Sequence, residues 1–358
     1  MNSIPLVARE GYLKTINLNM KLSLYLIAVL VLAVSPITGE TEKWDECGHD
    51  LSKPTGLDSL VDLKFLGRVL RSLVPFQKPD VTMHFYLYKR AFPTCGQELR
   101  MDDDSLQKSD FNKNHPTRII IHGWLSQSKA SLNRDIKDAY LEIGDFNVII
   151  VDWSIASSTL NYYRVVRLIE DFGQVVADFA KHLHNTLGVD YDSIYLIGHS
   201  LGAQIAGSAG KRLKPGQFNT IFALDPAGPA FREKDLECRI DPTDAKYVES
   251  IQTSVNLGLL QPVGNATFFP NNGVYQKCLG FGCSHSRAYK FFAESIVSST
   301  GFWGTVCDNE TRKWHCPEKG KQYKMGGEPS SPKSGTFYVR TRTKSPYAIG
   351  KNLKYVYS

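Results

Sequence analysis

The sequence predicts an α/β protein with a mostly parallel central sheet that helices cover on both faces. Apolar runs of strand length alternate along the chain with segments of helical periodicity. Each run is apolar throughout, as is typical of parallel strands buried on both faces. One run, Ile194–Ile197, passes through a glycine-flanked turn directly into a helix-like segment rich in small residues. At 358 residues, with 42% hydrophobic and 22% charged, the chain suits one large globular α/β domain.

The N-terminal region has the features of a secretory signal. Residues 22–34 form an uncharged apolar run that follows a lysine, and this length suits a signal peptide but is short for a membrane span. An uncleaved signal anchor is the alternative. We expect residues 1–39 to be a signal peptide and residues 40–80 an N-terminal segment with one amphipathic helix near Leu57–Leu73. Residues 81–358 are then the α/β domain.

The cysteines are those of an exported protein, since all seven lie beyond the signal region. Two pairs are close enough in sequence to close small loops, and one cysteine of the odd number is a free thiol or bridges to another chain. The close pairs are Cys278 with Cys283 and Cys307 with Cys316, while the pairing of Cys47, Cys95 and Cys238 stays open. Asn265 and Asn309 begin glycosylation sequons.

The remaining elements follow from apolar patterning. The expected strands are Val81–Tyr88, Thr117–His122, Asn147–Trp153, Thr220–Leu224 and Val248–Gln252. The expected helices are Leu132–Ile143, a long amphipathic helix over Tyr162–Leu187, and a closing helix over Ser286–Val297.

The turn after the strand Ile194–Ile197 carries the pattern G-x-S-x-G, Gly198 to Gly202. Between a strand and a helix, this pattern is the nucleophile elbow, in which a strained turn lifts the Ser200 hydroxyl clear of the backbone. A side chain at either glycine would collide with a neighbouring strand or helix. The turn also aims the N–H of Leu201, at a helix N-terminus, toward an oxyanion on a substrate. A common Gly/Ser turn without catalysis is the alternative.

A nucleophilic serine needs a general base and a carboxylate that orients it. In the chain order Ser, acid, His, only His285 and His315 follow every plausible acid. His285 is favoured because it precedes an apolar helix, whereas His315 lies in a hydrophilic stretch. Asp225 ends the strand after Ser200, and the carboxyl ends of parallel strands share one edge. The competing acids are Asp235, Asp241 and Asp244, which lie in loop sequence.

A second oxyanion donor is expected from the loop after an early strand, where the N–H of Trp124 is the candidate. Two further histidines, His122 and His199, precede the acid. We expect both to be packed, hydrogen-bonded turn residues.

Several motifs occur in the order of a known family. They are Ile121-His122-Gly123-Trp124, Val151-Asp152-Trp153, Gly198-His199-Ser200-Leu201-Gly202-Ala203, Leu224-Asp225-Pro226-Ala227-Gly228-Pro229, Asp241-Pro242-Thr243-Asp244-Ala245, Phe268-Phe269-Pro270-Asn271 and Cys283-Ser284-His285. Together they resemble the animal pancreatic lipase family, above all its insect members and the venom phospholipases A1. The resemblance covers roughly residues 80–350. It implies an α/β-hydrolase fold, hydrolysis of lipid carboxylesters without an organic cofactor, and a triad of Ser200, Asp225 and His285.

The chain departs from that family in three ways. It stops soon after residues 337–339, so the resemblance implies a single catalytic domain without a C-terminal β-sandwich and without a colipase-type partner. The lid between Cys278 and Cys283 encloses only four residues, and the loop 254–267 is short. Short forms of both loops accompany phospholipase A1 activity in this family. In the calcium loop Asp241 and Asp244 match, but Leu236 replaces a glutamate, so we expect no metal.

We therefore expect a secreted serine esterase, most specifically a phospholipase A1 that cleaves the sn-1 ester of glycerophospholipids at a lipid surface. The alternatives are a triacylglycerol lipase and a non-catalytic lipid-binding or storage protein like the dipteran yolk proteins. The formal net charge of +6 is mild and has no charge runs, which argues against nucleic acid as a partner. Basic residues from Lys333 onward could attract an anionic membrane or form a solvated basic face.

Overall fold

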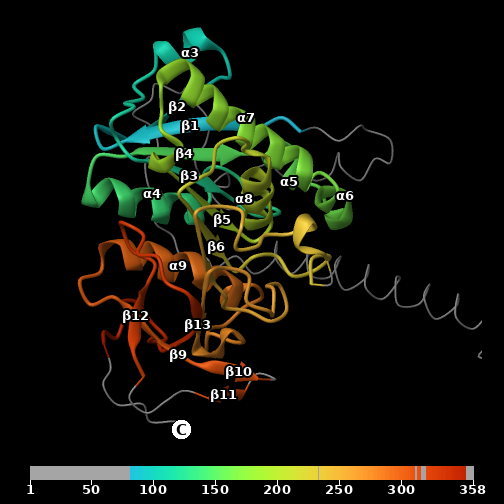
Figure 1. The fold of residues 1–358 in the computed structure, drawn as a ribbon, viewed down its shortest axis with the longest axis vertical. Coiled ribbons are helices and arrows are strands. Elements are labelled where there is room, and N and C mark those ends of the chain that lie inside the picture. The colour runs from blue at the N-terminus through green and yellow to red at the C-terminus, as the bar shows by residue number, and fades with distance from the viewer. Residues whose placement is uncertain (1–80, 233, 311–312, 316–319, 352–358) are drawn as a thin grey trace, which may run out of the picture.

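The computed structural model describes residues 81–358, apart from residues 233, 311–312, 316–319 and 352–358. The expected signal peptide and N-terminal segment, with the helix near Leu57–Leu73, lie outside these residues. In the described part, an 11-stranded sheet has the order β12-β9-β13-β8-β7-β6-β5-β3-β4-β1-β2 (Figure 1). No helix among the described residues is long and apolar enough to cross a bilayer.

The central strands of this sheet are parallel, and both of its edges are antiparallel. All pairings from β4 through β3, β5, β6, β7 and β8 to β13 are parallel. The pairings β1–β2, β1–β4, β9–β13 and β9–β12 are antiparallel. The strands are β1 (His84–Lys89), β2 (Phe92–Leu99), β3 (Thr117–Ile121), β4 (Asn147–Asp152), β5 (Ile194–His199), β6 (Thr220–Leu224), β7 (Tyr247–Ile251), β8 (Ala266–Pro270), β9 (Phe302–Val306), β12 (Gln322–Met325) and β13 (Gly335–Val339), with a separate hairpin of β10 (Asp308–Glu310) and β11 (Lys313–His315).

Helices cover both faces of the sheet, as the sequence predicts. The helices are α3 (Asp103–Gln107), α4 (Ser131–Ile143), α5 (Ser154–Ser157), α6 (Tyr162–Val166), α7 (Ile169–Leu187), α8 (Leu201–Arg212) and α9 (Cys283–Val297). Side chains alternate between the two faces along each strand. In β3, Ile119 and Ile121 join the buried cluster that contains α7 and α8, and Ile120 joins the cluster of α4 and α9. The predicted α/β class, with its mostly parallel sheet, is confirmed.

The single helix expected over 162–187 is wrong, because the chain forms two helices there. The N–H of Leu168 bonds to the carbonyl of Val165 at 2.9 Å, a tighter three-residue turn that ends α6. Helix α7 then begins at Ile169 and ends at Leu187, and the next residue, Gly188, adopts φ 71°. Both helices bury the same face, so the apolar periodicity continues across the break and does not reveal it in the sequence.

The closing helix begins three residues earlier than expected, at Cys283. His285 therefore lies in the first turn of α9 rather than before it. The glycine before the helix, Gly282, has φ 74°, a conformation that favours glycine.

The expectation of a solvated basic C-terminal face is wrong for Lys333. Its side chain is only 3% exposed, and its ammonium donates to Glu249 Oε2 at 3.0 Å and to the carbonyl of Lys324 at 2.6 Å. Glu249, in the middle of β7, is fully buried and also accepts from the Tyr247 hydroxyl at 2.6 Å. Lys333 thus fixes the C-terminal segment to the sheet instead of facing solvent.

Candidate active site

Ser200 lies in a strained turn between β5 and α8. Its backbone has φ 58° and ψ −122°, a conformation that non-glycine residues seldom adopt. Its N–H bonds to the carbonyl of Leu224, and its carbonyl accepts from the N–H of Ala227, both at 3.1 Å. These bonds hold the turn against the end of β6, so the strain is supported by the neighbouring strand.

The glycines of the turn have the steric role that the sequence predicts. A Cβ at Gly198 would lie 2.4 Å from the carbonyl oxygen of Gly202, and one at Gly202 would lie 2.1 Å from that of Ile121. Gly123, after β3, is similarly restricted, because a Cβ there would lie 2.9 Å from the Cβ of Ser200. The turn after β3 therefore packs directly on the serine.

Asp225 and His285 are brought together at the end of β6. Asp225 is fully buried, and its Oδ2 lies 2.5 Å from His285 Nδ1. Its Oδ1 accepts the N–H groups of Thr253 at 2.7 Å and Ser254 at 3.1 Å. Its Oδ2 also accepts the Ser254 hydroxyl at 2.5 Å. Thr253 and Ser254 were not among the predicted site residues, because their only signal in the sequence is their position just after β7.

Ser200 and His285 line one cavity of about 450 Å³. Its walls come from the turn after β3, the start of α4, the elbow, the loop after β6 and the start of α9. Representative lining residues are Trp124, Leu132, Tyr162, Pro229, Phe281 and Tyr289. Within the described part of the chain, no hydrogen bond joins Ser200 Oγ to the His285 ring. The two side chains therefore share a cavity without a direct bond in this structure.

Trp124 and Leu201, the two expected oxyanion donors, both lie next to Ser200. Leu201 is the first residue of α8, and Trp124 is in the turn that packs on the serine. The indole of Trp124 donates to the carbonyl of Thr159 at 2.7 Å, and the next N–H, that of Leu125, bonds to the carbonyl of Ser157 at 3.0 Å. These contacts fix the turn to the segment 157–159.

His122 is buried and hydrogen-bonded, as expected. Its Nδ1 lies 2.9 Å from the Gly123 carbonyl, and its own carbonyl accepts the indole N–H of Trp153 at 2.9 Å. Asp152 lies beside its ring, with Oδ1 3.6 Å from Nε2. Burial opposes the charge on Asp152, but hydrogen bonds from His122, Ser128 and Ser154 hold the pKa of its carboxyl well below its usual range.

His199 is also buried, beside His285. Its Nε2 lies 3.1 Å from the His285 carbonyl oxygen, and its ring packs edge-on against Tyr289. Burial, together with the neighbouring His285, lowers the pKa of His199 well below 6.5. His199 is therefore neutral at physiological pH, and as a neutral donor it positions the first turn of α9.

The loop at the mouth of the cavity is short and apolar. Cys278 and Cys283 form a disulfide, as their spacing suggested. Within the loop, Leu279 is 96% exposed and Phe281, which lines the cavity, is 44% exposed. The four residues of this loop are too few to cover the cavity, so its mouth stays open.

Away from this loop, Cys238 is an exposed free thiol.

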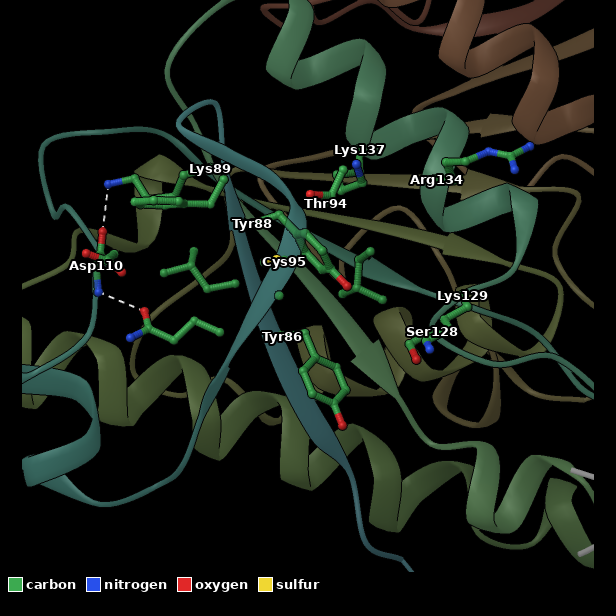
Figure 2. A pocket seen from close by; sticks show the side chains of 15 residues that line it. Tyr86, Tyr88, Lys89, Thr94, Cys95, Asp110, Ser128, Lys129, Arg134 and Lys137 are labelled. Atoms are coloured by element: carbon green, nitrogen blue, oxygen red, sulfur yellow. Dashed lines mark hydrogen bonds between the residues drawn. The ribbon is translucent and has the colours of Figure 1, made fainter. Parts of the chain in front are cut away.

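A larger cavity, of about 720 Å³, lies beside β1 and β2 and contains none of the expected site residues (Figure 2). Two of its lysines are engaged by the protein: Lys89 donates to the carbonyl of Asp110 and Lys137 to that of Pro93, both at 2.6 Å. Lys129 and Arg134 also line it, so the cavity carries basic side chains but none of the groups of the expected triad.

In the described part of the chain, the two carboxylates expected in a calcium loop are paired with a lysine instead of being free for a metal ion. Among the described residues there is no cluster of three or more histidine, cysteine, aspartate or glutamate side chains with the spacing of a metal site. Asp241 and Asp244, the two matching residues of the calcium loop, both pair with Lys211. Leu236, where the resemblance gives a glutamate, is half exposed and supplies no carboxylate.

A parallel sheet with a nucleophile elbow between β5 and α8 defines an α/β-hydrolase fold. Residues 68–347 match the model of the family described as Lipase. The chain belongs to the lipase family. The family match and the relatives support the assignment of this chain as a carboxylic ester hydrolase. This confirms the resemblance to the pancreatic lipases.

Individual relatives include both lipases and phospholipases. The chain is 32% identical to pancreatic triacylglycerol lipase of Mus musculus, covering 79% of this chain and 68% of the relative. It is 34% identical to pancreatic lipase-related protein 2 of Bos taurus, covering 66% of this chain and 56% of the relative. It is 38% identical to probable phospholipase A1 magnifin of Vespa magnifica, covering 70% of this chain and 79% of the relative. The matched segment thus spans about half to two thirds of the mammalian relatives.

Proposed function

We propose that this protein is a secreted phospholipase A1, which hydrolyses the sn-1 ester of glycerophospholipids with Ser200, His285 and Asp225. One observation carries the proposal: the buried Asp225 carboxylate bonds to the His285 ring at the edge of the cavity that Ser200 also lines. Nucleophile, base and orienting acid need this arrangement.

In the proposed mechanism, His285 Nε2 takes the proton of the Ser200 hydroxyl as its oxygen attacks the sn-1 carbonyl carbon. Asp225 keeps the His285 proton on Nδ1, so that Nε2 is the basic nitrogen. The N–H groups of Leu201 and Trp124 bind the oxyanion of the tetrahedral intermediate. His285 then protonates the leaving lysophospholipid oxygen, and water releases the fatty acid from Ser200 by the reverse sequence.

The open cavity mouth supports phospholipid as the substrate. A long lid hides apolar surface until a lipid interface displaces it, whereas a loop of four residues leaves room for a polar head group. The exposed side chains of Leu279 and Phe281 border this mouth and suit peripheral contact with a lipid surface. The Vespa relatives named phospholipase A1 are matched over 79% and 87% of their length. A triacylglycerol lipase is the second candidate, because the mouse relative carries that name.

The proposal is tested with a phosphatidylcholine that carries different acyl chains at sn-1 and sn-2, assayed beside a triacylglycerol. We expect the sn-1 chain to be released first and the triacylglycerol to be cleaved much more slowly. The matched control is Ser200→Ala, which should release neither chain. Faster cleavage of the triacylglycerol would favour the second candidate, and release of the sn-2 chain first would contradict the sn-1 assignment. A folded wild-type protein without activity on either lipid would favour a storage or binding role.

A further inference from the structure

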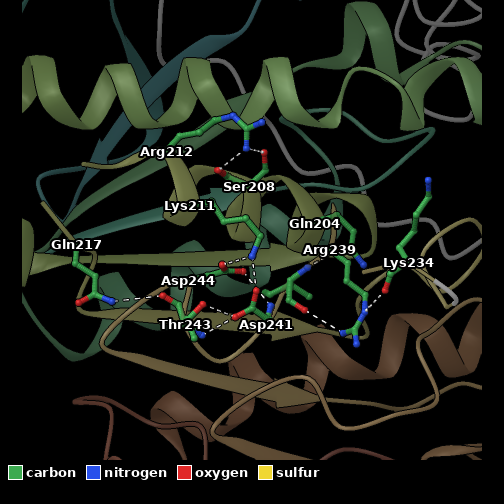
Figure 3. Close-up of polar contacts among 11 residues, drawn as sticks. Gln204, Ser208, Lys211, Arg212, Gln217, Lys234, Arg239, Asp241, Thr243 and Asp244 are labelled. Atoms are coloured by element: carbon green, nitrogen blue, oxygen red, sulfur yellow. Dashed lines mark hydrogen bonds and ion pairs between the residues drawn. The ribbon is translucent and has the colours of Figure 1, made fainter. Parts of the chain in front are cut away.

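The loop between β6 and β7 carries Asp241 and Asp244, and a lysine lies where the resemblance would put calcium. Lys211 comes from the last turn of α8, and its ammonium contacts Asp241 Oδ2 and Asp244 Oδ1 (Figure 3). One positive charge thus lies between two carboxylates.

Every oxygen of the two carboxylates already has a protein donor. Asp241 Oδ1 accepts the N–H and the hydroxyl of Thr243 at 2.7 and 2.6 Å, while its Oδ2 accepts from Lys211. Asp244 Oδ2 accepts the N–H of Asp241 at 2.9 Å, and its Oδ1 accepts from Lys211. Calcium takes six to eight oxygen ligands. In this cluster the Lys211 ammonium already contacts one oxygen of each carboxylate, where a cation would have to bind.

The cluster is buried, so its charges are poorly screened. The side chains of Asp244, Asp241 and Lys211 are 0%, 5% and 16% exposed. Removing one partner from a buried ion pair leaves an uncompensated charge, which is strongly destabilising. The two buried carboxylates therefore need the charge of Lys211 to be stable in the folded protein.

The cluster also joins two elements of the candidate active site. Helix α8 begins directly after Ser200, and the loop begins directly at Asp225. The helix and the loop pack closely, since a Cβ at Gly210 would lie 2.0 Å from the carbonyl oxygen of Asp244. The ion pairs of Lys211 join the C-terminal end of α8 to this loop.

We propose that the Lys211 ammonium is a built-in replacement for a divalent cation, so that this protein binds no calcium between α8 and the loop and needs none for stability. The charge that a metal would supply comes from the chain itself. This inference does not depend on the proposed phospholipase activity.

The test measures thermal unfolding and calcium binding of the wild type and of Lys211→Met. Methionine is unbranched and only one atom shorter than lysine, and it removes the charge. A matched control is Lys246→Met, because Lys246 also pairs with an aspartate, Asp192, but on the surface, where both side chains are about half exposed. Calcium binding is followed by equilibrium dialysis with radioactive calcium, and unfolding is followed with added calcium and with a chelator.

We expect wild type to bind no calcium in dialysis and to keep the same Tm in calcium and in chelator. Lys211→Met should lose roughly 5–10 °C in Tm, and calcium at millimolar concentration should restore part of that loss. Lys211 also lines a cavity of about 170 Å³, so solvent and a small ion can reach the position that methionine would leave uncharged. Lys246→Met should change Tm by less than about 1 °C.

Two results would overturn the proposal. One is binding of one calcium per wild-type chain, or a fall in its Tm when chelator is added. The other is a Lys211→Met variant whose Tm is unchanged, or is lowered but insensitive to calcium. If Lys211→Met does not fold, the wild-type dialysis alone still decides whether the position holds calcium.

Discussion

His285 Nδ1 lies 2.5 Å from Oδ2 of Asp225, and three further hydrogen bonds from Thr253 and Ser254 fix the same carboxylate. Asp225→Asn should therefore keep the fold while it lowers kcat by about 10⁴-fold, because an amide stabilises the wrong tautomer of the imidazole. Turnover of a soluble ester measures the effect, with unfolding as the check on structure. A variant that keeps more than a tenth of wild-type kcat would contradict the proposed role of Asp225.

The Ser254 hydroxyl donates to the same carboxylate oxygen that His285 contacts. Ser254→Ala should lower kcat by roughly 10-fold while KM changes little, because a less firmly held carboxylate orients His285 less well. The control is Ser250→Ala on β7, since Ser250 is buried but its hydroxyl has no hydrogen-bond partner in the described structure. Equal kcat losses in the two variants would show that Ser254 has no positioning role.

His199 makes the stability of the protein depend on pH. Burial and the neighbouring His285 lower the pKa of His199 well below 6.5, whereas in the unfolded chain it takes up a proton near pH 6.5. Below pH 6.5 the unfolded chain thus binds a proton that the folded chain does not. The free energy of unfolding should therefore fall by up to about 1.4 kcal/mol for each pH unit from this group alone.

His199→Gln isolates this effect, because glutamine does not titrate but retains a side-chain donor for the His285 carbonyl. Urea unfolding of both proteins between pH 7.5 and pH 5 is the measurement. The stability advantage of wild type over the variant should shrink as the pH falls below 6.5. Parallel pH profiles would exclude His199 as the titrating group.

Arg118 and Glu328 form a buried pair that holds the C-terminal segment against β3. The guanidinium donates to both carboxylate oxygens, at 3.0 and 2.6 Å, and lies 3.7 Å from the ring centre of Tyr195. Arg118→Met should cost about 3–5 kcal/mol in the free energy of unfolding, since Glu328 is then left buried and unpaired. Replacing both residues by methionine should recover much of this loss.

The exposed pair of Arg100 and Glu98, at 3.9 Å, provides the comparison for Arg118. Arg100→Met should change the free energy of unfolding by less than about 1 kcal/mol, because solvent screens the pair. If the two arginine variants lose equal stability, burial is not the reason why Arg118 matters.

The sequence predicted the central half of the fold because each strand there is a continuous apolar run. The strand ends at Ser200 and Asp225 could be predicted for the same reason. Chain order then left His285 and His315 as the base, and the apolar helix after His285 favoured it. The antiparallel edge at β1 could not be predicted, since strand pairing depends on neighbours far apart in the chain. Nor could the contacts of Ser254, which reach Asp225 only because β6 and β7 pair in register.

Two misjudged features have a common cause. The break near Leu168 and the burial of Lys333 both depend on what packs against those residues, whereas the local pattern is that of a continuous helix or of a solvated charge. Lys211 is a similar case. A basic residue in the last turn of a helix is ordinary, and only the return of the loop with Asp241 and Asp244 gives it two partners.

Labelling with a fluorophosphonate tests the central claim most directly, because the reagent modifies only a serine that a neighbouring base activates. The account predicts one label per chain, located at Ser200 by peptide mass spectrometry, and none on Ser200→Ala. A folded wild-type protein that stays unlabelled, or that carries its label on another residue, would contradict it.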